Sequence, residues 1–145
     1  MLKLSDADTI IAAALKEGRS RNFAPLTVAV LDAGGHLVAF KREDNSGILR
    51  FGIATAKAWG SLGMGFGSRE LARRADAHPA FVNTLSDISQ GRIATSPGGV
   101  LILKDGMVIG AVGISGDNGD NDEICAIAGV KAAGFNARAE TADAL

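Results

Sequence analysis

Two pairs of apolar runs, each joined by a tight glycine-containing turn, constrain the fold of this chain more than any other feature. The first pair is Leu26–Leu31 and His36–Lys41, joined by DAGG, and the second is Val100–Lys104 and Met107–Ile114, joined by Asp-Gly. Apolar runs on either side of such turns are typical of β-hairpins. The sequence therefore predicts two antiparallel hairpins.

Helical patterns surround these hairpins. We predict helices over Ser5–Ser20, Ile48–Leu62, Ser68–Ala75 and Asp122–Ala137, and a helical turn over Phe81–Ile88. Because helices and strands do not alternate as they do in parallel sheets, this order predicts an α+β fold with helices packed on an antiparallel sheet. The 145 residues fit a single domain.

Composition excludes several classes of function. The net charge is −1, from 15 basic and 16 acidic side chains, and aromatic residues make up 5%, so we expect no nucleic-acid partner. No apolar run approaches the ~18 residues of a membrane span. The single cysteine, Cys125, cannot form an internal disulfide, and we expect a small buried side chain in a cytoplasmic protein. The histidines and Cys125 lack metal-site spacing, so no metal site is predicted.

Glycine is unusually frequent in this chain, with 19 residues. Gly98, Gly99, Gly113 and Gly116 lie in or beside predicted strands, where glycine marks a close approach of backbone or ligand. We expect them to line a pocket for a small molecule. The Ala- and Gly-rich helices and a mean hydropathy of +0.19 further predict a homo-oligomer, in which apolar surface is buried between subunits.

A few charged residues are candidates for the site, each with an ordinary alternative. Asp32 either borders a pocket or closes its turn. Lys57 lies in a helix of small residues and either faces a ligand or extends into solvent. Asp122 and Glu123 begin the last helix, where they either favour the helix dipole or orient a ligand, with Glu123 as a base. Arg69 follows a glycine-rich loop and either binds an anion or pairs with a carboxylate.

The segments VAVLDAGGHLVAFKRED, TAKAW and PGGVLILKDGMVIGAVGISGDNGDNDEICAIAGVKAAG together resemble the GlcG/HbpS family, also called the haem-degrading-domain family, over about Leu26 to Gly134. The resemblance implies a profilin-like fold, with a central antiparallel sheet flanked by helices, and homo-oligomers. It also implies haem as a cofactor, and relatives include the C-terminal domain of corrinoid adenosyltransferases. The residues that match are Asp32, Gly34, Gly35, Arg42, Lys57, Gly98, Gly99, Gly113, Gly116, Asp122 and Glu123.

Two functions remain open from the sequence. The first is binding of haem, a corrinoid or another small molecule, as an accessory to a catabolic pathway. The second is a small isomerase or lyase that acts on an organic acid, with Lys57 and Glu123 as catalytic residues. Wide apolar walls with an axial His or Thr favour haem, whereas a narrow polar pocket that holds Lys57 beside Glu123 favours a small acid.

Overall fold

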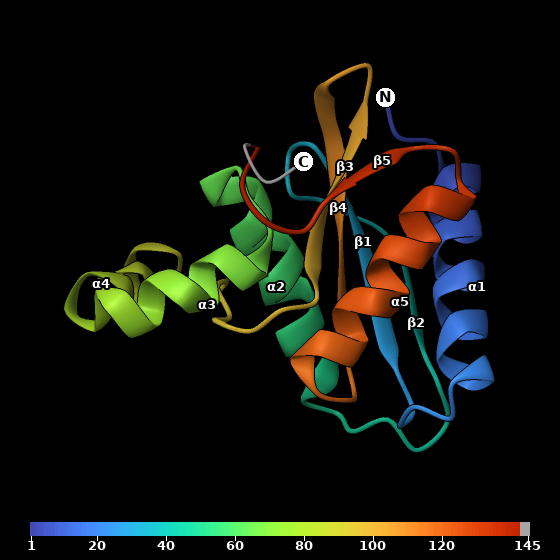
Figure 1. Ribbon diagram of the computed structural model, residues 1–145, viewed down its shortest axis with the longest axis horizontal. Coiled ribbons are helices and arrows are strands. Elements are labelled where there is room, and N and C mark those ends of the chain that lie inside the picture. Colours follow the sequence, from blue (N-terminus) through green and yellow to red (C-terminus); the bar gives the residue numbers. More distant parts are fainter. Residues whose placement is uncertain (143–145) are drawn as a thin grey trace.

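The computed structural model describes residues 1–142. Within this part of the chain, helices and strands follow the order expected from the two hairpins (Figure 1). The elements are α1 (Leu4–Ser20), β1 (Thr27–Asp32), β2 (Leu37–Arg42), α2 (Arg50–Met64), α3 (Ser68–Ala77), α4 (Pro79–Ile88), β3 (Gly99–Lys104), β4 (Met107–Ser115), α5 (Gly119–Ala132) and β5 (Asn136–Arg138).

The strands form one antiparallel sheet in the order β2-β1-β4-β3-β5. Strands β1 and β2 are the first predicted hairpin, and β3 and β4 are the second. Strand β1 also pairs with β4, which joins the two hairpins in the middle of the sheet. The predicted α+β fold with a central antiparallel sheet is therefore confirmed.

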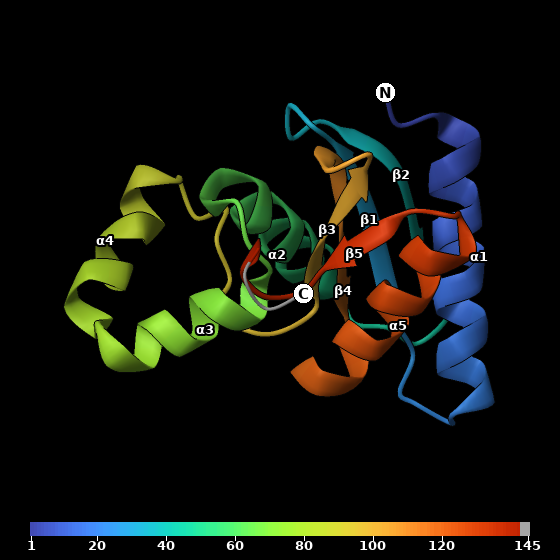
Figure 2. The same ribbon diagram turned by 45° about the horizontal axis from the view of Figure 1, so that its top comes forward.

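Helices cover both faces of the sheet (Figures 1 and 2). Helices α1 and α5 lie on one face and bury the larger core, where Ile10, Val28 and Val130 are inaccessible to solvent. Helix α2 lies on the other face, over a smaller cluster that contains Leu101 and Ala111. No helix of residues 1–142 has the length and apolar character that crossing a membrane requires.

Helix α4 is longer than predicted. The sequence predicts a helical turn over Phe81–Ile88, and the structure has a helix that begins at Pro79. Proline is favoured at the first helical position because its missing N–H would have no partner there. Helices α3 and α4 bury Leu71, Val82 and Leu85 in a cluster of their own, so they form an arm that projects beyond α2 (Figure 2).

The predicted end of the last helix is wrong. The sequence predicts a helix over Asp122–Ala137, whereas α5 ends at Ala132 and β5 follows. Gly134 has a φ of 86°, a left-handed conformation that ends helices. Residues of β5 then pair with β3. This pairing is a contact between distant parts of the chain, so local periodicity does not reveal it.

Helix α2 touches the sheet through glycines. A Cβ atom added to Gly113 would lie 1.9 Å from the carbonyl oxygen of Ala54, and one added to Gly99 would lie 2.3 Å from that of Lys57. These distances are far below van der Waals contact, so a larger residue would displace α2 from β3 and β4. The structure therefore differs from the expectation that the strand glycines leave room for a ligand, because the α2 backbone fills that room.

We expect Gly113→Ala to lower the free energy of unfolding by about 1–3 kcal/mol, the usual cost of overpacking a core. Gly52→Ala is the control, since Gly52 lies in α2, the helix that contacts Gly113 of β4, and has no atom within 4 Å of an added Cβ. The control should stabilise the protein by roughly 0.5–1 kcal/mol through helix propensity. Urea denaturation measures both changes, and an unchanged stability of Gly113→Ala would contradict the close contact.

Candidate functional site

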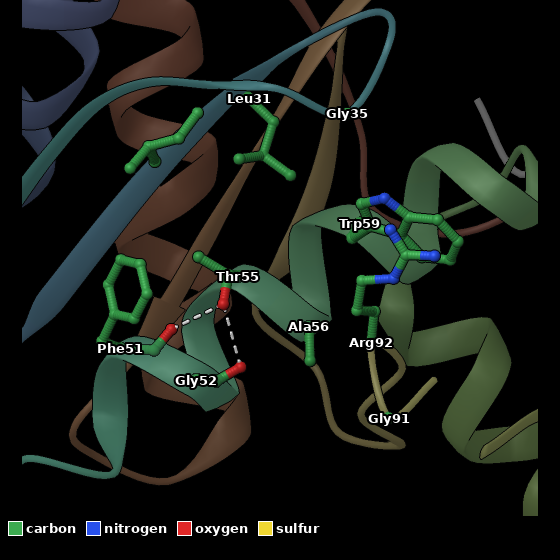
Figure 3. A pocket seen from close by; sticks show the side chains of 10 residues that line it. Leu31, Gly35, Phe51, Gly52, Thr55, Ala56, Trp59, Gly91 and Arg92 are labelled. Carbon is green, nitrogen blue, oxygen red and sulfur yellow. Dashed lines mark hydrogen bonds between the residues drawn. The ribbon is translucent and has the colours of Figure 1, made fainter. Parts of the chain in front are cut away.

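A hollow of about 380 Å³ lies between α2 and the β1–β2 hairpin and is open on one side (Figure 3). We call it the α2 pocket. Its walls come from the hairpin, from the outer face of α2 and from the loop that follows α4. The side chains that define it are Leu31 and Leu37 of the hairpin, Phe51, Thr55 and Trp59 of α2, and Arg92 of the loop.

Helix α2 supplies one wall of the pocket. Phe51, Thr55 and Trp59 are spaced four residues apart, so they share one face of the helix. Figure 3 shows them along the helix, with Leu31 across the hollow. The ring of Phe51 is packed edge-on against Phe40 of β2, with centroids 4.8 Å apart. This contact fixes the distance between α2 and the edge of the sheet.

Arg92 closes one end of the pocket. Its guanidinium lies 4.0 Å from the centroid of the Trp59 ring, and its Nε donates a hydrogen bond to the Ser89 carbonyl at 2.8 Å. A guanidinium over an indole gains cation–π attraction, which holds the charge at the rim. Its terminal nitrogens have the geometry to bind a carboxylate with two hydrogen bonds.

Thr55 places a hydroxyl in the middle of the wall. Its Oγ1 donates a hydrogen bond to the carbonyl oxygen of Phe51 at 2.8 Å and also lies within hydrogen-bond distance, 3.1 Å, of the carbonyl oxygen of Gly52 (Figure 3). The proton is therefore used within the helix, and the oxygen keeps lone pairs for a ligand. The pocket combines apolar walls, one hydroxyl oxygen and a cation at its rim. Such a site suits a flat apolar molecule that carries an acidic group.

Lys57 and Asp122 form a buried ion pair on the inner side of α2. The Lys57 Nζ lies 3.0 Å from Oδ2 of Asp122 and donates to the Ile114 carbonyl at 2.9 Å, and the two side chains are 3% and 1% exposed. Burial lowers the pKa of Lys57 and raises that of Asp122, since each charge loses its water, while the partner charge opposes both shifts. Protein atoms thus enclose the ammonium group, and the pair ties α2 to α5 and β4.

Glu123 belongs to a different charge pair. Arg69 of α3 donates from Nε to Oε2 of Glu123 at 2.9 Å, and its terminal nitrogen pairs with Asp120. The hydrogen bonds that Arg69 donates to these carboxylates raise its pKa above the ordinary value. Of the two alternatives for Arg69, the structure has the pairing with carboxylates, which joins α3 to α5. Lys57 and Glu123 thus belong to two separate ion pairs.

The other residues predicted for the site lie in separate places. Oδ1 of Asp32 accepts the backbone N–H of Gly34 at 2.9 Å and closes the hairpin turn. Gly35 borders the α2 pocket beside Trp59, whereas Arg42 borders a polar hollow at the far end of β2. Neighbouring backbone crowds the strand glycines Gly98, Gly99, Gly113 and Gly116. The structure thus brings one of these residues, Gly35, to the α2 pocket.

Sequence reasoning misses most of the residues of the α2 pocket. Phe51 and Thr55 show helical spacing, but such a stripe is equally typical of a core. Trp59 is visible in sequence only as an apolar neighbour of Lys57. Arg92 follows a helix whose full length is not predicted, and no local pattern marks it. The loop reaches α2 through the tertiary fold.

The buried pair allows a test of its structural role. Lys57→Met leaves the Asp122 carboxylate buried without its cation, so we expect a loss of about 3–5 kcal/mol in the free energy of unfolding. Adding Asp122→Asn removes the uncompensated charge and should restore part of that loss. Urea denaturation of both single variants and the double variant gives the interaction free energy between Lys57 and Asp122. If the free energy lost in the double variant equals the sum of the losses in the two single variants, Lys57 and Asp122 do not interact directly.

The chain is similar in sequence to a known protein family and to characterised proteins. A family model described as haem degrading protein HbpS-like matches residues 2–131. Protein GlcG of Escherichia coli K12 is 33% identical over 112 residues, which cover 75% of this chain and 77% of GlcG. The corrinoid adenosyltransferase PduO of Salmonella typhimurium is 27% identical over 121 residues, and the match covers 83% of this chain but 35% of PduO.

The fold also matches solved structures. A crystal structure of PduOC in complex with haem superposes with a TM-score of 0.84 and 26% identity, over 93% of this chain and 96% of that chain. The antiparallel sheet and the sequence motifs therefore point to the same group of proteins. The resemblance read from the motifs is confirmed, and the chain belongs to the HbpS-like family.

Proposed function

We propose that this protein binds haem in the α2 pocket. The observation that carries the proposal is the combination of apolar walls with a guanidinium held on Trp59 at the rim. Support comes from the family, which is described as haem degrading, and from the fold shared with PduOC, whose structure contains haem. A corrinoid is the related alternative, since PduO is a corrinoid adenosyltransferase.

The residues of the pocket fit both chemical parts of haem. The faces of the macrocycle are apolar and would contact Leu31, Leu37 and Phe51. The acidic groups at its edge would pair with Arg92, whose fork of N–H groups matches a carboxylate. A volume of about 380 Å³ lies within the usual range for small-molecule pockets. The open side allows the rest of a larger ring to project into solvent.

Haem would bring an iron atom whose chemistry depends on its axial ligands. Thr55 is the residue in the wall with a hydroxyl oxygen, and His, Cys, Met and Tyr, the usual strong ligands, are absent from the described lining of the pocket. We therefore expect apolar contact and the acidic groups to supply most of the affinity. Thr55 would contribute a weak oxygen contact, and the absorption spectrum should be that of a weakly ligated, high-spin haem.

We expect haem titration to give a saturable shift of the Soret band at one equivalent. Arg92→Gln should weaken binding about tenfold, which corresponds to the loss of one charge-assisted hydrogen bond of ~1.4 kcal/mol. Gly52→Phe should abolish binding, because the new ring has space to enter the pocket without a clash in the helix.

Arg74→Gln is the matched control for Arg92, since the Arg74 guanidinium also lies over an aromatic ring, Phe66, but outside the pocket. Its affinity for haem should equal that of the unaltered protein. If Gly52→Phe folds normally and binds haem with unchanged affinity, haem does not occupy the α2 pocket. Parallel titration with a corrinoid would show which of the two macrocycles binds more tightly.

We also propose that the protein is a homo-oligomer. Leu37, Ile48 and Leu49 are 49%, 89% and 71% exposed and lie near the edge strand β2, where apolar side chains and unpaired backbone groups both meet water. Light scattering at micromolar concentrations should give a multiple of the 14.8 kDa chain mass. Ile48→Asp and Leu49→Asp together should lower that mass, and a monomer mass for the unaltered protein would contradict the proposal.

A further inference from the structure

A second hollow, of about 590 Å³, lies where the β1–β2 turn, the start of β4 and the N-terminal residues meet. Both ribbon views place this turn, the β3–β4 hairpin and the N-terminus at one end of the molecule (Figures 1 and 2). We call it the hairpin hollow. Its apolar lining includes Leu2, Val108 and Ile109, with His36 and Met107 beside them. It shares none of its described lining residues with the α2 pocket.

The imidazole of His36 is oriented by a carboxylate. Its Nδ1 lies 3.2 Å from Oδ1 of Asp32, which also accepts the backbone N–H groups of Gly34 and His36. The carboxylate at Nδ1 favours the tautomer that carries its proton on that nitrogen, which leaves the lone pair of Nε2 free. The side chain is 82% exposed and therefore accessible.

Met107 provides a second donor to the same hollow. It is the first residue of β4, and 70% of its surface is exposed. Thioether sulfur is a soft ligand and imidazole nitrogen an intermediate one, and together they favour copper over hard cations such as magnesium or calcium. A carboxylate that holds the second nitrogen of a ligating histidine is the usual support of such a site. Among residues 1–142 no group of three His, Cys, Asp or Glu could hold a metal ion, so a site here depends on thioether sulfur from Met107, with that of Met1 also at the hollow.

We propose that the hairpin hollow binds a soft monovalent metal ion, Cu(I), between Nε2 of His36 and the sulfur of Met107. Asp32 is a positioning residue, which fixes the tautomer and the direction of the imidazole and places a negative charge near the cation. The apolar floor excludes water from one side of the ion. The site is independent of haem binding, because the two hollows have different residues.

The experiment is a titration of the haem-free protein with Cu(I) under anaerobic reducing conditions, in competition with a chromophoric chelator. Of the three methionines and two histidines of the chain, Met64 and His78 lie outside the described lining of the hollow, so they are controls within the same molecule. The methyl NMR signal of Met107 should shift at one equivalent while that of Met64 stays in place. His36→Ala and Met107→Leu should each weaken binding at least tenfold, and Asp32→Asn about tenfold, as expected for ligands and for the group that orients one.

Met64→Leu and His78→Ala should leave the affinity unchanged. Cys125→Ser should also have no effect, because Cys125 is completely buried and burial raises the pKa of its thiol to about 12. Because His36 and Met107 are exposed, their replacement should leave the fold intact, and circular dichroism of each variant checks this. Unchanged affinity in folded His36→Ala or Met107→Leu, loss of binding in Cys125→Ser, or no Cu(I) binding by the unaltered protein would overturn the proposal.

Discussion

The contact between α2 and the strands β3 and β4 determines where everything else on that face of the sheet can lie. Gly99 and Gly113 allow the helix backbone to rest directly on the strands, with no side chain between them. The inner side of α2 is thus used for packing and for the Lys57–Asp122 ion pair, and its outer side turns Phe51 and Trp59 toward the β1–β2 hairpin. The pocket exists because one face of the helix is held so close to the sheet.

Charge pairs hold this arrangement at two points. Lys57 and Asp122 join α2 to the start of α5 through a buried ion pair, and Arg69 joins α3 to the same end of α5. Removing one partner of a buried pair costs far more than an exposed pair contributes, so a change at Lys57 or Asp122 alone should disturb α2 more than a change at an exposed pair would. The acidic start of α5 therefore serves as an anchor for two helices.

Local signals predict the elements of this fold better than they predict its site. The turn residues predict both hairpins, and the residues around those turns carry the motifs of the family. The strand β5 and the full length of α4 depend on contacts with distant residues. The strand glycines indicate from the sequence that backbone or a ligand approaches closely, but a strand glycine looks the same whether a ligand or a helix fills the space beside it. The sequence also leaves open whether Lys57 faces a ligand or solvent, because burial depends on the tertiary fold. Arg92 reaches the pocket only through the tertiary fold.

A crystal structure of the protein with haem would show directly whether the macrocycle occupies the α2 pocket. We expect density for the macrocycle against Phe51 and Leu31, with an acidic group within hydrogen-bond distance of Arg92 and the edge of the ring in solvent. The α2 backbone should remain in contact with Gly113. Haem bound at another place, with the α2 pocket empty and Arg92 still on Trp59, would show that the α2 pocket is not the haem site.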